Sequence, residues 1–392
     1  MHVKRLTLTD FRNYRAAEVE LEPGVTVFVG PNGQGKTNLV ESLGYLATVG
    51  SHRTSVDQAM IRAGQDAAIV RALLRHADRE LLVEVQLNRG AANRAQVNRS
   101  AVRTRELPRY FSSVLFAPED LALVRGEPSA RRRFIDELLV QRAPRLAGTQ
   151  ADYARVVTQR NSLLKSARAQ RLQSAQLSTL EIWDERLIEL GSELIDRREQ
   201  LVTELSEPVH AAYQAVAGVD QHPAISQRLS VLGAGGDDDD AEVGASAPGG
   251  DGPAGGRASQ PTRELFRAAL AGVRRKELER GLTLVGPHRD DLLFELNGLP
   301  AKGYASHGES WSFALALKLA SAELLRADST TGDPVLVLDD VFAELDANRR
   351  RALAGAIAGF EQVLITAAVL DDIPSELGAR LVRIAAGEVV EA

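Results

Sequence analysis

The sequence predicts a mixed α/β fold, in which an antiparallel β subdomain and an inserted helical arm accompany a core of buried strands. A short apolar, β-branched run at 25–29 is followed by a glycine-rich loop and a helical stretch at 37–48. Residues 68–97 contain two apolar segments and a turn, as in a meander of antiparallel strands. Residues 129–206 keep the apolar spacing of helices.

The glycine-rich loop reads GPNGQGKT and fits the phosphate-loop pattern G-x-x-x-x-G-K-[ST] at every defined position. Its glycines allow a close approach of the backbone, so that loop N–H groups and the helix N-terminus can face one anion. Lys36 can supply positive charge to the β- and γ-phosphates, and the Thr37 hydroxyl can ligate Mg²⁺. We therefore expect ATP and Mg²⁺ as cofactors. The expected nucleotide contacts are Gly30, Pro31, Asn32, Gly33, Gln34, Gly35, Lys36 and Thr37.

Composition places limits on the class of protein. The 392 residues suggest two or three domains, and the absence of cysteine suits a cytoplasmic protein. No apolar run is long enough to cross a bilayer. The net charge of −6 is concentrated in residues 233–260, which carry six acids and one base. An acidic total therefore does not argue against nucleic-acid binding.

The helical arm predicted from residue 129 divides by charge. Residues 129–172 carry ten bases and three acids, whereas residues 176–207 carry three bases and nine acids. We expect breaks near Pro144 and Gly148, and two antiparallel helices of about 30 residues, which reach roughly 45 Å. Residues 233–260 have almost no large apolar residues and are predicted to be a disordered insertion.

Shorter elements are predicted on either side of the arm. Strands are expected at 2–9, 18–21, 113–116 and 292–296, and helices at 262–280 and from Ser306 to about Leu325. Asn297-Gly298 is a strong hairpin signal.

Two further motifs suit a phosphate-loop enzyme. The apolar run from Pro334 ends in Asp339 and Asp340, which would hold Mg²⁺ and orient the attacking water. The alternative is a strand that ends in a solvated turn. Ser306 and Gly308 open the long helix and can present a hydroxyl and N–H groups to a γ-phosphate. The alternative for Ser306 is an ordinary helix cap.

The order of these motifs resembles the ATP-binding-cassette heads of the SMC group, and most closely the RecF family. The likeness rests on PEDLALVRGEPSARRRFID at 118–136, GPHRDDL at 286–292 and VLDDVFAELDANRRRAL at 337–353. It covers most of the chain from residue 3 to about 366. The chain departs from the usual pattern at Glu127 and Glu309. An aspartate at 340 and threonine near 366, in place of the glutamate and histidine of transport cassettes, suggest slow hydrolysis.

The resemblance implies an ABC-type head with lobes at 1–120 and 276–392 and an inserted arm at 121–275. It also implies that two copies meet head to tail, with Ser306 of one capping the γ-phosphate held by Lys36 of the other. Lys36, Asp339 and Asp340 would be the catalytic residues, and Thr37 and Asp339 the metal ligands.

Three residues outside these motifs are also candidates. Arg12 and Asn13 resemble residues that approach the nucleotide in related heads, the alternative being a surface turn. Arg53 is a candidate arginine acting in trans.

The partners that the resemblance implies are duplex DNA at single-strand gaps, RecO and RecR, with RecA loaded downstream. This would make the chain a weak, DNA-dependent ATPase in DNA repair, DNA replication and the SOS response. Arg131, Arg132 and Arg133 are the candidate DNA contacts, unless they pair with acidic residues.

The sequence leaves other functions open. The main alternative is a structural DNA clamp that uses ATP only as a latch, although the short arm argues against long-range tethering. A transporter subunit would need a membrane partner, and a nuclease of the overcoming-lysogenization type would need a further acidic domain.

Overall fold

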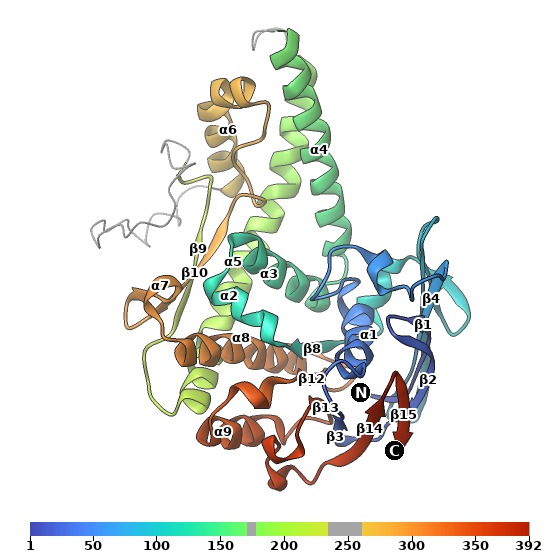
Figure 1. Cartoon of the computed structure of the whole chain (residues 1–392). Coiled ribbons are helices and arrows are strands. Elements are labelled where there is room, and N and C mark those ends of the chain that lie inside the picture. The colour runs from blue at the N-terminus through green and yellow to red at the C-terminus, as the bar shows by residue number, and fades with distance from the viewer. Residues whose placement is uncertain (171–177, 234–260, 392) are drawn as a thin grey trace. The chain divides into compact units, whose positions relative to one another are not determined.

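The computed structural model describes residues 1–170, 178–233 and 261–391 (Figure 1). The insertion predicted at 233–260 lies outside the described residues from 234 on. The predicted division into two head lobes and an arm, with boundaries at 120 and 275, stays a prediction. The structure forms two compact units whose boundaries differ from these. Unit 1 comprises Met1–Ala147, Val202–Ile225 and Phe294–Ala392, and unit 2 comprises Gly148–Leu201 and Ser226–Leu293.

An antiparallel sheet forms one part of unit 1, with the strand order β2-β1-β4-β5-β6-β7. Along β4, buried and half-buried residues alternate, so one face of the sheet is packed and the other is open. The predicted meander is confirmed, and β7 is an additional strand. The strands are β1 (His2–Phe11), β2 (Tyr14–Glu20), β4 (Ala67–His76), β5 (Arg79–Asn88), β6 (Arg94–Val97) and β7 (Ser100–Val102).

The second sheet of unit 1 has the order β15-β14-β3-β13-β12-β8, and its strands are parallel except for β15. β12 and β13 are buried along their whole length, which explains their continuous apolar sequences. The strands predicted at 25–29, 113–116 and 334–340 are confirmed. The strands are β3 (Gly24–Val29), β8 (Ser113–Phe116), β12 (Val335–Asp339), β13 (Gln362–Ala367), β14 (Arg380–Ala385) and β15 (Glu388–Glu391).

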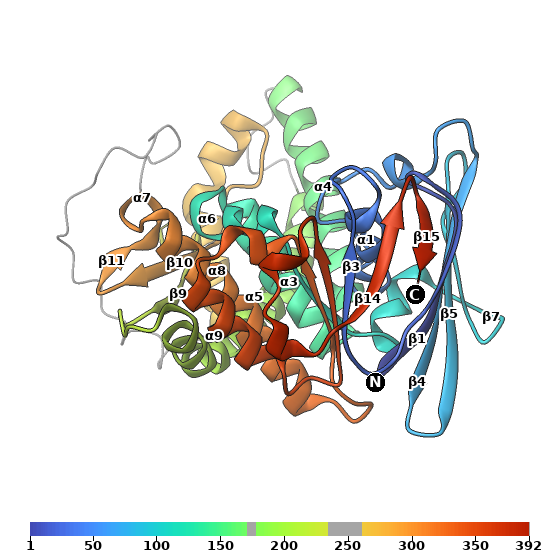
Figure 2. The same cartoon turned by 60° about the horizontal axis from the view of Figure 1, so that its bottom comes forward.

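Helix α1 (Lys36–Thr48) packs between the two sheets (Figure 2). Leu39, Val40, Leu43 and Leu46 are fully buried and share one core with residues of both sheets. Burial of four such side chains contributes on the order of 6–12 kcal/mol before the entropy of folding is subtracted. The phosphate loop before α1 is therefore anchored on a rigid helix.

Of the remaining helices of unit 1, α3 (Pro128–Arg142) and α8 (His307–Asp328) pack near the parallel sheet, whereas η1 (Asp57–Met60) and η2 (Thr104–Arg109) lie against strands of the antiparallel one. Ser306, which was predicted to begin the long helix, is the N-cap of α8. The other α-helices are α2 (Leu121–Arg125), α7 (Ala301–Tyr304) and α9 (Ala347–Ile357). The other 3-10 helices are η3 (Pro118–Asp120), η6 (Val341–Glu344), η7 (Leu370–Asp372) and η8 (Ser375–Leu377).

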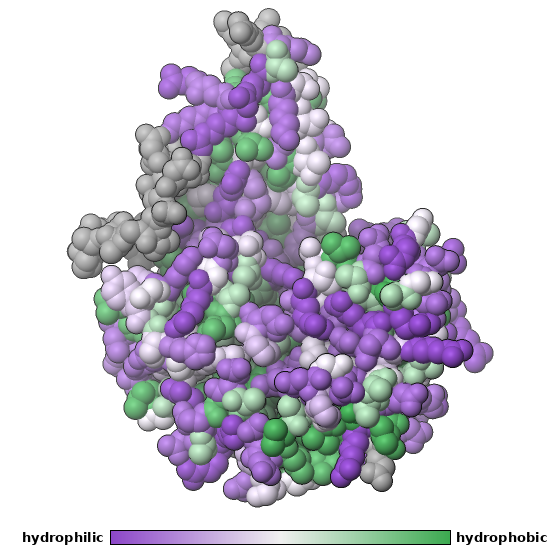
Figure 3. All heavy atoms as spheres, in the orientation of Figure 1, coloured by the Kyte–Doolittle hydropathy of each residue, from purple (hydrophilic) through white to green (hydrophobic). Residues whose placement is uncertain are grey.

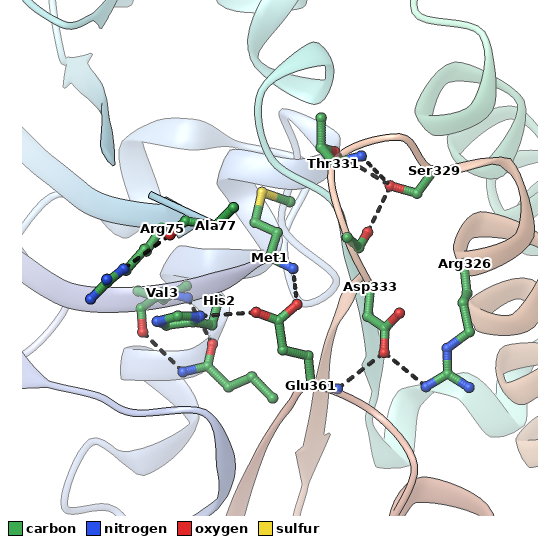
Figure 4. Close-up of polar contacts among 12 residues, drawn as sticks. Met1, His2, Val3, Arg75, Ala77, Arg326, Ser329, Thr331, Asp333 and Glu361 are labelled. Atoms are coloured by element: carbon green, nitrogen blue, oxygen red, sulfur yellow. Dashed lines mark hydrogen bonds and ion pairs between the residues drawn. The ribbon is translucent and has the colours of Figure 1, made fainter. Parts of the chain in front are cut away.

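Polar contacts join the end of α8 to the sheets (Figure 4). The Asp333 carboxylate accepts hydrogen bonds from the Arg326 guanidinium and from the Glu361 N–H, at 2.9 and 3.1 Å. The buried Gln362 side chain accepts from the Val3 N–H and donates to the Val3 carbonyl. These bonds fix the parallel sheet against the first strand of the antiparallel one.

Unit 2 is mainly helical, with most of α4 (Leu146–Gln170) and α5 (Ser178–Ala217), and α6 (Thr262–Arg280). α4 and α5 run antiparallel, because Thr149 bonds Glu193 and Arg160 bonds Asp184. The break predicted near Pro144 is confirmed.

Two boundary predictions for these helices are wrong. α4 continues through Gly148, where a helix interior tolerates glycine at a modest cost. α5 does not end at residue 206 but continues to Ala217, with Pro208 inside it.

A small third sheet, β11-β10-β9, lies where the units meet in sequence. The hairpin predicted at Asn297-Gly298 is confirmed, since both residues have positive φ, at 50° and 74°. Its strands are β9 (Ala224–Arg228), β10 (Asp291–Leu296) and β11 (Leu299–Pro300).

Candidate nucleotide site

The candidate site forms where four neighbouring parallel strands end. β3, β13, β12 and β8 lie side by side in that order, and the phosphate loop follows β3 directly. Asp339 ends β12, and Thr366 stands opposite it in register on β13. Parallel strands bring residues that are far apart in sequence to the same edge of a sheet, where ligands bind in open α/β folds.

The phosphate loop holds Lys36 in a defined position. The Lys36 side chain is buried, and its Nζ donates to the carbonyl oxygens of Gly30 and Pro31 at 2.8 and 3.2 Å. Gly33 and Gly35 have φ angles of 80° and 116°, which favour glycine. A Cβ on Gly30 would lie 2.2 Å from the Ile384 carbonyl oxygen, so β14 leaves no room for a side chain there.

Asp339 is the centre of the polar contacts at this edge. Its Oδ1 accepts hydrogen bonds from the Thr37 and Thr366 hydroxyls, at 3.0 and 2.6 Å. Burial raises the pKa of Asp339 to about 6, against the lowering effect of these two bonds. Asp340 and Glu119 add negative charge nearby and raise it further. The alternative of a solvated turn is therefore wrong for Asp339.

The donor set at this edge fits Mg²⁺. A threonine hydroxyl and a buried carboxylate converge here, and hard divalent cations prefer such oxygen ligands. The buried negative charge also needs a counter-charge, because burial disfavours an isolated carboxylate. Thr37 and Asp339 are thus the residues that would hold the ion. Glu119, whose charge acts on Asp339, was not named as a site residue from the sequence, although it follows a core strand closely.

Asp340 follows in a left-handed conformation with φ of 52°. Its N–H donates to the Thr366 hydroxyl at 2.9 Å, which fixes the turn. Burial raises the pKa of Asp340, while Lys36 lowers it. A carboxyl group with a raised pKa that is half-buried beside the loop is suited to accept a proton from water.

Arg12 and Arg53 contact α1, and Asn13 contacts both α1 and the phosphate loop. Arg12 makes a bidentate contact with the fully buried Glu41, at 2.8 and 2.6 Å. Arg53 donates to Asn38 at 2.8 Å and lies 3.7 Å from Glu41. Asn13 donates to the Gln34 carbonyl at 3.1 Å. Arg12 and Asn13 do form the turn between β1 and β2, and Asn13 is exposed, so their approach to the nucleotide stays a prediction.

Glu41 was missed by sequence reasoning, because a glutamate in a helix usually faces water. Burial alone would raise its pKa, but hydrogen bonds from Arg12 and Ser51 and the charges of both arginines lower it overall. Glu41 therefore stays ionised and holds two arginines beside the phosphate loop.

Ser306 and Gly308 form a separate group at the start of α8. The Ser306 hydroxyl accepts a hydrogen bond from the Glu309 N–H at 3.3 Å, and the Glu309 carboxylate accepts one from the Ser306 N–H at 2.7 Å. The cap interpretation is thus confirmed, and Ser306 remains exposed. Within the described ranges, the hydrogen bonds of Ser306 go to its own helix and none reaches the phosphate loop.

Arg349 also stands at this helix end, which sequence reasoning missed. A Cβ on Gly308 would lie 2.6 Å from Arg349 Nη1, so the glycine makes room for the guanidinium. Asp346 pairs with Arg349 at 3.1 Å. A cation at the positive end of a helix is unfavourable unless anions lie close by. Asp346 and Glu309 supply such anions at the start of α8.

The predicted DNA contacts Arg131, Arg132 and Arg133 have unequal exposure. Arg131 is buried and donates to the carbonyls of Leu123 and Gly126. Arg132 is half-buried, and Arg133 bonds Glu137 at 2.7 Å. Since Arg131 ties α2 to α3 from inside, we do not carry it forward as a DNA contact.

Comparison with known proteins decides the family. The model of the RecF/RecN/SMC N-terminal domain matches residues 2–386. A protein of Leifsonia xyli subsp. xyli named DNA replication and repair protein RecF is 66% identical over 391 residues, and the match covers 100% of both chains. The chain is a member of the RecF family. A RecF of Streptomyces avermitilis is 51% identical, with 99% of each chain covered.

Solved structures agree with the RecF assignment. A structure described as the recombination mediator protein RecF with ATP in the RecFOR pathway has a TM-score of 0.84 and 27% identity, and covers 100% of this chain and 97% of its own. An SMC head domain from Pyrococcus furiosus matches with a TM-score of 0.53 and 15% identity, over 100% and 96% of the two chains, which supports the fold alone. The predicted ABC-type head fold is confirmed. ATP hydrolysis is the general activity of this ATPase family.

The helices in the described part of the chain are shorter or more polar than a membrane span. None of them is long and apolar enough to cross a bilayer.

Proposed function

We propose that this RecF family member acts in DNA replication and repair as an ATP-dependent dimer that binds duplex DNA beside single-strand gaps. Relatives that match along the whole chain are named DNA replication and repair protein RecF, and a related structure is described as RecF with ATP. The site residues add a mechanism, in which ATP closes two copies of the chain around the nucleotide.

One observation carries this proposal: the nucleotide site is divided into two groups of residues. The loop half comprises Gly30–Thr37, Asp339 and Asp340, and its side chains bond one another. The α8 half comprises Ser306, Gly308 and Glu309, and Ser306 is exposed with no described bond to the loop half. A helix N-terminus with an exposed hydroxyl suits an anion held by a second copy.

The roles at the loop half follow from its geometry. Lys36 and the loop N–H groups would bind the phosphates, and Thr37 and Asp339 would hold Mg²⁺, which neutralises charge on the transferred phosphoryl group. Asp340 would orient the attacking water and accept its proton. An aspartate reaches less far than a glutamate, so we expect a weak, DNA-stimulated ATPase.

The proposed partners follow from the family. A structural relative belongs to the RecFOR pathway. By analogy, RecO and RecR would bind this chain, and RecA would be loaded downstream. The cytoplasmic location expected from the sequence stays a prediction.

The structure supports a DNA surface other than the predicted arginine trio. The arginine segment, residues 89–109, carries six arginines and one acid. All six are exposed; Arg89 donates to the Gln65 carbonyl, and no ion pair joins the other five to another residue in the described part of the chain. Hydrophilic side chains cover the antiparallel sheet that bears the segment (Figure 3). The five are Arg94, Arg99, Arg103, Arg105 and Arg109.

Arginines without carboxylate partners bind DNA phosphates at low cost, because no internal ion pair has to break. The bases of the arm offer less charge than the count suggests, since Arg160 is fully buried with Asp184 and Glu277. Arg142 likewise pairs with Glu204 and Asp328. The arginine segment is therefore the better candidate for the DNA contact.

The dimer is tested by measuring mass in solution with ADP, ATP and a non-hydrolysable ATP analogue. Wild type should double its mass with ATP and with the analogue, but not with ADP. Ser306→Arg should still bind ATP yet remain monomeric, while Ser100→Arg, on an exposed strand of the antiparallel sheet, should dimerise normally. An unchanged mass of wild type with the analogue would overturn the proposal.

DNA binding is tested by charge reversal at Arg99, Arg103 and Arg105 together. Duplex affinity should fall and the slope of log affinity against log salt should drop by about 3. The double variant Arg132→Glu and Arg133→Glu tests in the same way whether the arginines at 131–133 bind the duplex. If only this second variant loses affinity, the arginine segment is not the DNA surface.

The clamp alternative differs in its need for hydrolysis. Asp340→Asn should keep ATP-dependent dimerisation and block turnover. If this variant still supports RecA loading on gapped DNA, ATP acts only as a latch and the clamp interpretation holds.

A further inference from the structure

A cluster of two histidines and one aspartate lies at the end of α5, outside the nucleotide site. His210 is on the last turns of the helix, and Asp220 and His222 follow in the loop after it. One donor atom from each lies within 4.8 Å of the others. We propose that His210, Asp220 and His222 form a binding site for a divalent transition-metal ion of the Zn²⁺ class.

The distances fit a tetrahedral ion. His210 Nε2 lies 3.0 Å from Asp220 Oδ1, and His222 Nδ1 lies 3.5 Å from Asp220 Oδ2. Bonds of about 2.0–2.1 Å at a tetrahedral angle place two ligand atoms roughly 3.3 Å apart. The two separations are near this value, although they run to different oxygens of Asp220, and one donor atom from each residue lies within 4.8 Å of the others. Side-chain rotation then has to draw the three donors together around the ion.

The chain path brings the three donors together. Gly218, with φ of 71°, ends the helix and turns the chain back. His222 itself has φ of 47°, a conformation that is uncommon for residues other than glycine. Asp220 Oδ1 also accepts the His222 N–H at 2.8 Å, which holds the loop in this shape. A carboxylate oxygen has a second lone pair, so this bond and a metal bond are compatible.

The donor types select the ion. Imidazole nitrogens suit Zn²⁺, Co²⁺, Ni²⁺ and Cu²⁺, whereas Mg²⁺ and Ca²⁺ prefer oxygen ligands alone. The site is therefore chemically distinct from the Thr37–Asp339 edge. Three protein ligands leave the fourth position of a tetrahedral ion to water. The partial exposure of all three side chains gives the ion direct access from solvent.

Gln221, between two of the ligands, links the cluster to α8. Its side chain donates to Glu309 Oε1 at 2.6 Å, and its carbonyl accepts the Asn297 N–H at 2.7 Å. Glu309 Oε2 in turn accepts the Ser306 N–H. An ion that fixes Asp220 and His222 would thus restrain the bonds that shape the start of α8. This consequence, unlike the binding itself, rests on the proposed role of Ser306.

Binding is tested on untagged wild-type protein without ATP or DNA, so the result is independent of the proposed function. Calorimetric titration with Zn²⁺ should show one site per chain, and Co²⁺ should give the visible bands of a tetrahedral complex. His210→Ala and His222→Ala should each weaken Zn²⁺ binding at least about tenfold. His76→Ala, at the end of β4, should bind as wild type does.

Asp220→Asn separates metal binding from folding, because its amide oxygen can still accept the His222 N–H. It should lose Zn²⁺ affinity while its thermal midpoint without metal stays close to that of wild type. Absence of a one-to-one Zn²⁺ complex, or an affinity unchanged in both histidine variants, would overturn the proposed site.

The link to α8 has its own readout. Zn²⁺ should slow hydrogen exchange of the amides of residues 306–310 in wild type and leave it unchanged in His222→Ala. Equal exchange with and without Zn²⁺ in a protein that binds the ion would remove the link but leave the metal site.

Discussion

The loop half and the α8 half of the nucleotide site differ in how the chain satisfies their polar groups. In the loop half, Lys36 and Asp339 are buried and bonded to groups of the same sheet edge. In the α8 half, Ser306 is exposed and bonded within its own helix. One half is thus organised by its own sheet, and the other presents its hydroxyl and helix end outward.

On the proposed mechanism, this difference would let ATP join two copies of the chain. Buried hydrogen bonds preorganise the loop half, so little ordering remains when nucleotide binds. The α8 half has a helix N-terminus, which favours an incoming anion, while the nearby Arg349 is paired with Asp346. Changes in the loop half should therefore alter nucleotide binding or stability, and changes in the α8 half should alter dimerisation.

The largest effect is expected in the loop half from Lys36→Met. Loss of a buried ammonium that would make charge-assisted bonds to the phosphates should weaken ATP binding about 100-fold. Fluorescent-ATP titration measures this, with Lys165→Met, an exposed lysine of α4, as the control. An affinity equal to that of wild type would show that this loop does not bind the phosphates.

Glu41→Gln should cost about 2 kcal/mol of unfolding free energy at neutral pH, since it leaves two arginines without their carboxylate. The pKa of Glu41 in the folded protein lies below its ordinary value of 4.5. Its stabilising effect is therefore present above pH 4.5 and lost as the pH falls through the folded pKa.

Denaturant unfolding at several pH values checks this expectation for Glu41. The difference between wild type and Glu41→Gln should shrink below pH 4.5. Glu18→Gln, at an exposed strand position, should stay within about 0.5 kcal/mol throughout. A difference that does not vary with pH would mean that the Glu41 charge contributes nothing.

Asp346→Ala should cost about 1 kcal/mol, because Asp346 caps α9 by accepting from the Asn348 and Arg349 N–H groups. Asp346→Asn keeps a capping oxygen and should lower the free energy of unfolding by only about 0.3 kcal/mol. Both variants lose the charge that pairs with Arg349. If both weaken ATP-dependent dimerisation equally despite their different stabilities, Arg349 is positioned by that charge.

Gly308→Ala should change the unfolding free energy by less than about 1 kcal/mol, since alanine favours a helix while its Cβ displaces only the mobile end of Arg349. Dimerisation with ATP should nevertheless weaken. Gly355→Ala, in α9 with open space around its Cβ, is the control. Normal dimerisation of Gly308→Ala would assign the α8 half a purely structural role.

Motifs with strict local chemistry could be predicted from the sequence alone. The GPNGQGKT loop needs a strand before it and a helix after it, and both are present. The cap at Ser306 and the turn at Asn297-Gly298 depend on a few neighbouring residues, and both are confirmed.

Predictions that depended on charge or on helix ends were less accurate. Arg131 belongs to a basic run, yet its side chain is buried where α2 meets α3. α5 continues past Ser206, and Pro208 does not end it. The strands β14 and β15 were not predicted; β15 forms a hairpin with β14, but β14 joins the sheet only through β3, which is distant in sequence.

The sequence by itself determined the phosphate loop, the Asp339–Asp340 pair and the start of α8, because each depends on residue types a few positions apart. Only the tertiary structure decided which of these groups meet. The parallel order of β3, β13 and β12 brings Thr37 to Asp339, while Ser306 stays bonded within its own helix. It also decided that Glu41 is buried and that His210 meets His222, since such long-range contacts arise from the path of the chain and leave no local pattern.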